Sequence, residues 1–525
     1  MTRPQRAALI GIVLVGLTLR VAYFVHAVRM PGFVWEDPDG YAAHALTLTP
    51  HGWHWTFQAV SFRINGQQHA LPPMYPVFLS LFALFPGFPM TAQIAQVGLA
   101  VLTIALVFAL GRRIHSVRAG LVAAAAYALW VPNINNVWST SQETLYVPLI
   151  LTAFLLLFRA IEGDAGWVGF AVAGLAFGVS ALTRSMPLFF ALPAAAAHVG
   201  LARDRARAAL QASAFLAGFV LLTVPYSTAL SRYFGQVTVI DTHGSIHLEA
   251  ETEPGSIAPG LSETASGLWR AATAHPIDFA VESLGRAQSL FHVNGGRILQ
   301  IYVVAATRLR AVVWKVVVLA GSDLLLIVAS ILAAIGAALC RRPPLAALLV
   351  IWIVVNIGIA SAGGFGGARL RAPFEPMLIV FAAICAAGEW GRPRAWVLGL
   401  AVAASGAAAL AVLPQVPASL RAWPDYGVRW PSIFDRHDGE ILGEAGLNLP
   451  ARDGAAALAA TTTGEAPVVV RVIVSGLPAR EIQLAPRQST PIRVPWPALG
   501  LAFVELVTAG PAATAQPVHV IVDGR

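Results

Sequence analysis

Apolar stretches of about the length that crosses a membrane recur along the first 413 residues of the chain. The hydrocarbon core of a bilayer is about 30 Å thick, and an α-helix needs about 20 mostly apolar residues to cross it. Eleven stretches come near that length, so the pattern predicts an all-α polytopic membrane bundle of about eleven transmembrane helices. These stretches are residues 7–28, 90–111, 119–137, 144–161, 165–183, 186–202, 209–229, 317–340, 345–362, 373–388 and 395–413.

The composition agrees with a membrane protein and excludes other classes. Apolar residues make up 57% of the 525 residues and charged residues 12%, about half of the ~25% that is usual in soluble domains. A disordered chain, a collagen-like chain and an ordinary soluble enzyme are therefore excluded. All but one of the 35 basic residues are arginine, Lys315 being the exception, and this bias indicates a bacterial source. The two cysteines, Cys340 and Cys385, fall in or at apolar stretches and imply no disulfide framework.

The arginines also set the expected orientation in the membrane. The net charge is +8, and most arginines lie in short connections between apolar stretches, which is typical of membrane topology and not of nucleic-acid binding. With the N-terminus in the cytoplasm, every inner connection is positive, and the short outer connections are poorer in arginine. An odd number of spans then leaves the C-terminus outside a plasma (inner) membrane.

Three outer segments are long under this orientation. Residues 29–89 and 230–316 form outer loops of a transmembrane domain, 1–413, and residues 414–525 follow that domain. The last segment contains alternating apolar runs such as Val468–Val474, broken by Gly and Pro. Such runs favour strands, so we expect a small β-rich extracytoplasmic domain over residues 414–525.

An acidic cluster opens the first outer loop. Glu36, Asp37 and Asp39 lie within four residues, directly after the first span, where carboxylates are costly unless they are solvated or used. Asp37 followed by Pro38 is typical of a helix N-cap with proline at the first helical position. A divalent-metal site is a second interpretation and a catalytic carboxylate a third. The loop also holds four histidines, at no spacing diagnostic of metal ligands: His44, His51, His54 and His69.

Four further motifs follow in order. Leu71-Pro72-Pro73-Met74-Tyr75-Pro76 precedes a short apolar run, and Ser141–Leu145 opens the fourth span. A glycine-rich span ends in Thr183-Arg184, and Arg369–Pro376 reads Arg-x-Arg-x-Pro-x-Glu-Pro before a late span. Asp37 and Tyr41 form an Asp-x-x-x-Tyr pattern before these motifs. The whole order resembles membrane glycosyltransferases of the GT-C type, nearest to the protein O-mannosyltransferase-like and aminoarabinose-transferase-like group (family 39 type). The resemblance covers about residues 7–390 and implies a GT-C-like bundle.

The resemblance also implies site residues. Asp37 matches the position of a base that takes the proton of the acceptor, and Glu143 is a candidate for a second acid that orients the acceptor. Some relatives carry a lysine before the Pro-Pro pair, where this chain has Leu71, so contact with the donor phosphate would fall to arginine. The residues implied for substrate binding are Asp39, Tyr41, Tyr75, Arg184, Arg308, Arg369, Arg371 and Glu375.

Structural interpretations of these residues stay open beside the functional ones. Arg184, Arg369 and Arg371 would also serve as anchors at the membrane interface. Glu375 would also form an ion pair with a neighbouring arginine. Asp39 would orient the sugar or cap the helix that follows it.

The activity that the resemblance implies is transfer of a sugar from a polyprenyl-phosphate donor to an acceptor on the outer face of the membrane, with inversion at the anomeric carbon. The expected partners are this lipid-linked donor, the bilayer and an acceptor that is a protein, a lipid or a polysaccharide, without nucleic acid. No cofactor is implied with certainty, although a divalent metal is possible. Two alternatives stand beside it: a polytopic transporter or lipid flippase, and a non-catalytic membrane protein that binds envelope glycan.

Overall fold

The structure is a computed structural model. It describes residues 1–28, 41–48, 61–64, 67–137, 140–163, 166–241, 261–291, 312–362, 368–388, 390–393, 395–412, 438–441, 444–452, 455–462, 468–474, 480–485, 488–495, 500–509 and 518–522.

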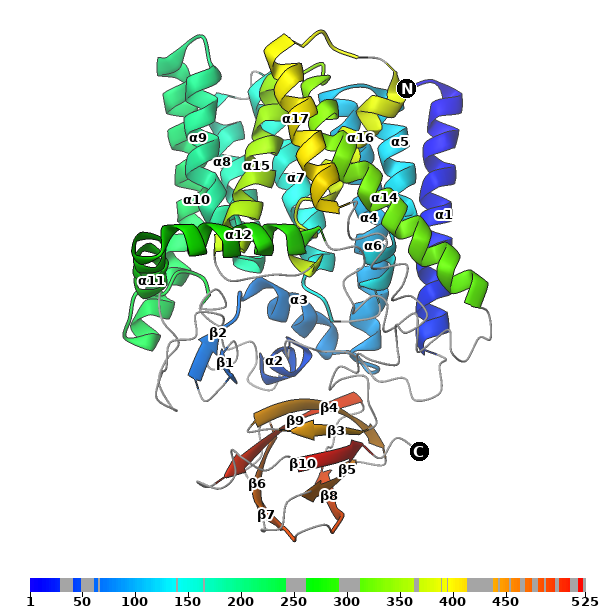
Figure 1. The fold of residues 1–525 in the computed structure, drawn as a ribbon, viewed down its shortest axis with the longest axis vertical. Helices are drawn as coiled ribbons and strands as arrows, with labels where there is room; N and C mark the ends of the chain where they lie inside the picture. The colour runs from blue at the N-terminus through cyan, green and yellow to red at the C-terminus, as the bar shows by residue number, and fades with distance from the viewer. Residues whose placement is uncertain are drawn as a thin grey trace.

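Long helices lie side by side and form a bundle, with α1 at one edge (Figure 1). Every apolar stretch expected to span the membrane contains at least one of them. The bundle helices are α1 (Arg3–Val28), α4 (Met90–Ile114), α5 (Val117–Ala128), α7 (Glu143–Glu162), α8 (Gly166–Thr183), α9 (Pro187–Leu201), α10 (Arg205–Phe234), α14 (Val312–Ala338), α15 (Pro343–Ala362), α16 (Glu375–Ala387) and α17 (Ala395–Val412).

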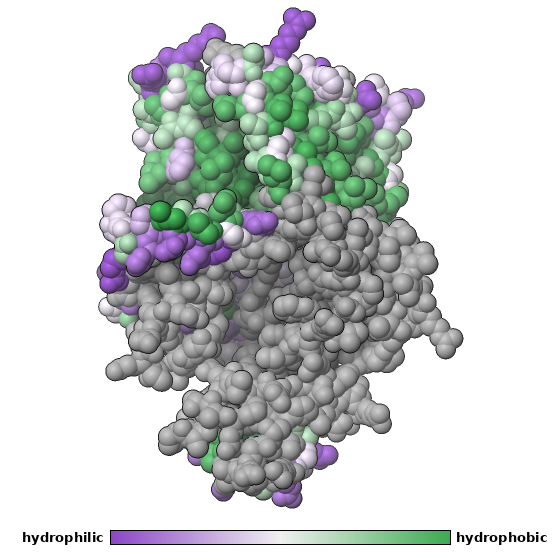
Figure 2. Space-filling model, in the orientation of Figure 1, coloured by the Kyte–Doolittle hydropathy of each residue, from purple (hydrophilic) through white to green (hydrophobic). Residues whose placement is uncertain are grey.

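Six of the described helices are long and apolar enough to cross a membrane: α1, α4, α7, α8, α10 and α15. A multi-pass membrane protein is thereby confirmed, and on the face that Figure 2 shows the bundle carries an apolar band. The other five expected spans fall on shorter apolar helices or helix segments, so that their crossing stays a prediction. These segments are Val117–Ala128, Pro187–Leu201, Leu324–Ala338, Glu375–Ala387 and Ala395–Leu410.

The structure divides the expected span 119–137 into two helices, α5 and the short helix α6 (Val131–Asn135). Trp130 is extended, with φ −72° and ψ 107°, and Pro132 lies at the start of α6. Proline has no N–H to donate to the preceding turn and favours the first turn of a new helix. The chain therefore bends at Trp130, and this bend turns the indole toward the interior, where it is 2% exposed.

Glycine sets the contact between α8 and α10. A Cβ atom on Gly174 would lie 1.9 Å from the carbonyl oxygen of Phe215, and one on Gly218 would lie 2.2 Å from that of Ala171. No side chain fits at either distance, so the two backbones touch directly, as small residues allow in membrane helix pairs. The ends of α8 and α10 are thus held in a fixed relation.

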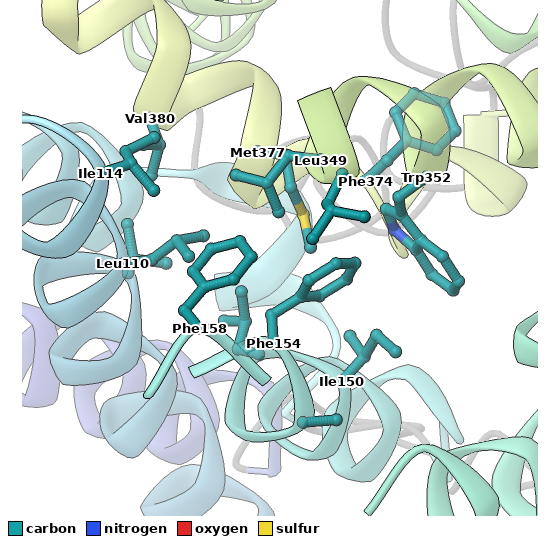
Figure 3. Packing of buried hydrophobic residues seen from close by; sticks show 14 of the residues in the cluster. Leu110, Ile114, Ile150, Phe154, Phe158, Leu349, Trp352, Phe374, Met377 and Val380 are labelled. Carbon is teal, nitrogen blue, oxygen red and sulfur yellow. The ribbon is translucent and has the colours of Figure 1, made fainter. Parts of the chain in front are cut away.

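Aromatic side chains fill the centre of the bundle, where α7 meets its neighbours (Figure 3). The Phe154 ring lies 5.1 Å from that of Phe177, 5.3 Å from that of Phe190 and 5.7 Å from that of Trp352. Edge-on and tilted ring pairs at these distances stabilise the fold in addition to the contribution of the apolar area that they bury. The core thereby joins α7 to α8, α9 and α15.

One charged side chain is completely buried within the bundle. Arg20 of α1 has no exposed surface, and its guanidinium donates to the side-chain oxygen of Asn133 and to the carbonyls of Ala128 and Gly16. Ala128 ends α5, and a helix C-terminus carries partial negative charge. The arginine therefore ties α1 to the junction between α5 and α6.

The longer connections gather at one end of the bundle, which we call the loop face (Figure 1). The first connection supplies α2 (Tyr41–Leu48), the hairpin β1 (Ser61–Ile64)–β2 (Gln67–Ala70) and α3 (Met74–Ala83). The second supplies α11 (Leu261–Ala274) and α12 (Pro276–Leu290), and η3 (Ala368–Arg371) precedes α16. The short apolar run after the proline-rich segment belongs to α3, which buries Tyr75 and Leu79 and exposes Leu81.

The C-terminal region is β-rich, as predicted. Its described strands form an antiparallel sheet in the order β3-β10-β5-β4-β9-β6-β7, with β8 paired to β5. The apolar run expected as a strand is β6. The strands are β3 (Asp438–Ile441), β4 (Glu444–Arg452), β5 (Ala455–Thr462), β6 (Val468–Val474), β7 (Arg480–Leu484), β8 (Thr490–Pro495), β9 (Gly500–Ala509) and β10 (Val518–Val522).

Candidate active site at the loop face

Three pairs of predicted site residues come together at the loop face. α7 begins there, α8 ends there and α16 begins there, because successive helices run in opposite directions. The motifs of the first connection, of α7, of α8 and of α16 therefore share one end of the bundle, although they are far apart in the sequence.

Glu143 and Arg184 form the first pair. Nη1 of Arg184 donates to Oε1 of Glu143 at 2.8 Å, and the Ser141 hydroxyl donates to Oε2 of the same carboxylate. The Glu143 side chain is 1% exposed and the Arg184 side chain 10% exposed. Glu143 is the first residue of α7, where the helix dipole favours a negative charge. This geometry confirms contact between two predicted residues, and it is also that of a buried structural ion pair.

Arg371 and Glu375 form the second pair. They are four residues apart, and Nε of Arg371 donates to Oε1 of Glu375 at 2.8 Å. Nη1 of Arg371 donates to the carbonyl of Leu290, the last residue of α12, at 2.5 Å. The indole N–H of Trp130 donates to Oε2 of Glu375 at 2.8 Å. The ion pair that the spacing allowed is confirmed, and it links η3, α16, the bend before α6 and the end of α12.

Tyr41 and Tyr75 form the third pair. Their rings lie edge to face, with centroids 5.0 Å apart, and both side chains are buried. The Tyr75 hydroxyl donates to the side-chain oxygen of Gln96 on α4. Their apolar cluster includes Leu145, two residues after Glu143. The first connection is therefore packed against the beginning of α7, beside the first ion pair.

The helix core supports the second pair as well. The indole N–H of Trp352 on α15 donates to the carbonyl of Pro373, inside the Arg-x-Arg-x-Pro-x-Glu-Pro motif, at 3.0 Å. The same indole packs on Phe154 of α7. The motif that carries the second ion pair is thus fixed to the aromatic core.

Two buried polar atoms near the start of α7 have no hydrogen-bond partner among the described residues. They are the side-chain oxygen of Gln142 and the hydroxyl of Tyr146. Buried polar groups almost always have a hydrogen-bond partner. A polar ligand could supply the missing partner of these two atoms. Gln142 is the N-cap of the helix that carries Glu143, and Tyr146 lies in its first turn.

Several predicted site residues lie outside the described residues. They are Asp37, Asp39 and Arg308, together with the side chain of Arg369, whose backbone belongs to η3. Of the four histidines considered as metal ligands, His51 and His54 also lie outside. Within the described part of the chain, no group of three or more His, Cys, Asp or Glu side chains has the arrangement of a metal site. The roles proposed for these residues stay predictions.

Trp130 and Arg20 were not predicted as members of the site or its support. The proline two residues after Trp130 indicates a helix boundary there. Nothing in the sequence, however, places Trp130 beside Glu375, 245 residues away. Arg20 could have been found, because an arginine at the fourteenth position of the apolar stretch 7–28 is costly unless it is partnered.

A buried arginine–carboxylate pair next to unpaired polar atoms can bind an anion and a hydroxyl compound together. Guanidinium groups hold phosphate and carboxylate through parallel hydrogen bonds. Inside a low-dielectric site such bonds are stronger than in water. The arrangement therefore suits a ligand that carries both an anionic group and hydroxyl groups.

The sequence of residues 70–231 matches the family model of dolichyl-phosphate-mannose-protein mannosyltransferases. The matched segment is less than a third of the chain, and it contains Tyr75, Glu143 and Arg184. No curated protein sequence matches the chain closely enough to count as a relative.

Solved membrane enzymes are similar to the chain at low identity. The oligosaccharyltransferase AglB from Archaeoglobus fulgidus, solved with an inhibitory peptide and a dolichol-phosphate, is 14% identical over 81% of this chain and 56% of its own, with a TM-score of 0.46. ArnT from Cupriavidus metallidurans, bound to undecaprenyl phosphate, is 16% identical over 80% and 66%, with a TM-score of 0.42. Arabinofuranosyltransferase AftD from mycobacteria is 15% identical over 83% and 28%, with a TM-score of 0.39.

The chain spans between a quarter and two thirds of the length of these structures, so their activities are statements about them alone. All three, and the family that matches residues 70–231, are glycosyltransferases of the GT-C type. The family match over residues 70–231 bears out the resemblance to GT-C membrane glycosyltransferases that the motifs indicate.

Proposed function

We propose that this protein transfers a sugar from a polyprenyl-phosphate-linked donor to an acceptor on the outer face of the membrane, by direct displacement with inversion. The observation that carries the proposal is the family match over residues 70–231. That segment includes the buried Glu143–Arg184 pair at the loop face and Tyr75 beside it. In this proposal the loop face is the outer face.

The proposed reaction needs positively charged side chains at the leaving phosphate and no general acid. A phosphate leaving group is ionised at neutral pH, so it requires a positive charge that stabilises the developing anion and no proton donor. Arg184 and Arg371 are buried guanidinium groups at the loop face, and each is already oriented by a carboxylate. We assign to Arg184, Arg308, Arg369 and Arg371 contact with the phosphate of the donor.

The acceptor must lose a proton as it attacks the anomeric carbon. A carboxylate within hydrogen-bond reach performs this step, and we assign it to Asp37. Asp37 is four residues before Tyr41, which packs on Tyr75 within the matched segment. We assign orientation of the acceptor to Glu143, and contact with sugar hydroxyls to Asp39, Tyr41, Tyr75 and Glu375.

The test is sugar transfer from radiolabelled polyprenyl-phosphate hexoses and pentoses in membranes that contain the protein. The wild type is compared with Asp37→Asn and with Asp278→Asn, a control that neutralises an exposed carboxylate on α12. We expect the wild type and the control to release label from one donor, and Asp37→Asn to retain it. The product should carry the anomeric configuration opposite to that of the donor.

Two outcomes would contradict the proposal. Equal release by all three proteins would remove Asp37 as the base. A wild type that releases no label from any donor, while it folds and inserts normally, would contradict lipid-linked sugar transfer itself.

A further inference from the structure

Helix α12 exposes a row of large apolar side chains that no described part of the protein covers. Ile277 is 76% exposed, Val281 65% and Leu284 73%. These residues are four and three positions apart, so they share one face of the helix. Trp269 on the adjoining α11 is 72% exposed.

The rest of α12 divides into two other faces. Phe279 and Ser283 are half-buried and Leu290 is fully buried, on the side that contacts α15 and η3. Asp278 and Glu282 are exposed on the remaining side. One face thus packs on the bundle, one is polar, and one is apolar but uncovered.

The helix lies across the bundle at the loop face instead of along it (Figure 1). Figure 2 shows apolar atoms on the side of α12 that meets the apolar band of the bundle, and polar atoms on the side turned away from it. This is the arrangement of a helix that lies in the plane of a membrane interface, with its apolar face buried about 5–10 Å into the boundary between headgroups and acyl chains.

Two hydrogen bonds fix α12 at this level. Nε of Arg286 donates to the carbonyl of Ser361, at the end of α15, at 2.6 Å. Nη1 of Arg371 donates to the carbonyl of Leu290, at the end of α12. Both acceptors are main-chain carbonyls, so the position of α12 is set relative to the span α15 and to η3.

We propose that the α11–α12 hairpin is seated in the bilayer leaflet at the loop face, with Trp269, Ile277, Val281 and Leu284 in contact with lipid. The occupant of this face is lipid and not a protein, because the face continues the band by which the spans already meet the bilayer. A tryptophan at its edge is typical of such a boundary. The inference goes beyond sugar transfer and does not depend on it.

The test measures where a fluorescent label on α12 lies. The native Cys340 and Cys385 are replaced by serine, and single cysteines are introduced by Leu284→Cys, Glu282→Cys and Val354→Cys for labelling with an NBD dye. Each labelled protein is reconstituted in phosphatidylcholine–phosphatidylglycerol vesicles and exposed to iodide in the water or to lipids that carry a nitroxide at a shallow or a deep position. Val354 is 61% exposed in the middle of α15 and serves as the control for contact with lipid.

We expect the label at position 284 to lose fluorescence to shallow nitroxide lipids and to be protected from iodide. The label at 354 should be quenched best by deep nitroxides, and the label at 282, on the polar face, by iodide. Quenching at 284 by iodide as strong as at 282 would place this face in water and overturn the proposal. Protection at 284 from both quenchers would mean that protein covers the face, and would overturn it equally.

Discussion

The Glu143–Arg184 pair gives the most specific prediction about the site. Both side chains are nearly fully buried, and one guanidinium N–H···O bond of 2.8 Å joins them. Glu143→Gln leaves a buried cation without its anion, and Arg184→Gln leaves a buried anion without its cation. Either change should destabilise the protein by about 3–5 kcal/mol, the cost of removing one partner of a buried ion pair.

The double variant Glu143→Gln/Arg184→Gln should lose less than the two single losses together. Two neutral amides carry no uncompensated charge, and residues in direct contact show interaction energies of about 0.5–3 kcal/mol. A matched control is Glu282→Gln, which breaks the exposed Arg286–Glu282 pair on α12, at 3.2 Å. An exposed pair of this kind contributes about 0.2–1 kcal/mol, so the control should change little.

Thermal unfolding in detergent measures these differences through a dye that becomes fluorescent when it reacts with Cys340, which is 3% exposed in the folded protein. A loss of 1 kcal/mol lowers Tm by roughly 2–4 °C in domains of 150–250 residues and by less in larger ones, so the single variants should fall by several degrees. If Glu143→Gln unfolds at the same temperature as Glu282→Gln, the buried pair does not stabilise the protein and the reasoning is refuted.

Activity of the double variant separates the two roles of the pair. A double variant that regains thermal stability and remains inactive would support contact of these side chains with substrate. If it regains both stability and transfer, the pair is structural, and the assignment of acceptor orientation to Glu143 is wrong.

Two other substitutions test the support of the site. Gly174→Leu should push α8 away from α10, because even a Cβ atom would lie 1.9 Å from the carbonyl oxygen of Phe215. It should lower the free energy of unfolding by about 1–3 kcal/mol, which a lower Tm would report. The control is Gly11→Leu, which has open space at its Cβ, and equal Tm values for both variants would contradict the direct backbone contact. Trp130→Phe keeps an aromatic ring but removes the donor to Glu375, which should cost about 1.5–3 kcal/mol for a hydrogen bond to a charged group, and an unchanged Tm would contradict that bond.

The helices were predictable because their signal is local. A run of about 20 apolar residues has few alternatives to a spanning helix, and each expected run contains one. The break at Trp130 was missed because the apolar run continues through it, and Pro132 was the only cue. The strand β6 was visible for the same local reason, whereas the order of strands in the sheet depends on long-range pairing that no local pattern contains.

The site was predictable only in part. The Arg371–Glu375 pair follows from a spacing of four residues, which the sequence shows. The Glu143–Arg184 pair joins residues 41 positions apart, and the Trp130–Glu375 bond joins residues 245 apart. Such contacts depend on how the helices pack. The sequence motifs therefore identified Glu143, Arg184 and Glu375 as site residues, but only the structure shows which residues they contact.

The length of α10 has a consequence for the height of the site. Its 30 residues extend about 45 Å, whereas the hydrocarbon core is about 30 Å thick. The final turns, with Leu230 and Phe234, pack on Ala70, directly before Leu71 and the Pro-Pro pair. The excess length can therefore hold the first connection clear of the lipid tails, by at most roughly 15 Å. In the proposed reaction, an acceptor in water could then reach the first connection without entering the bilayer.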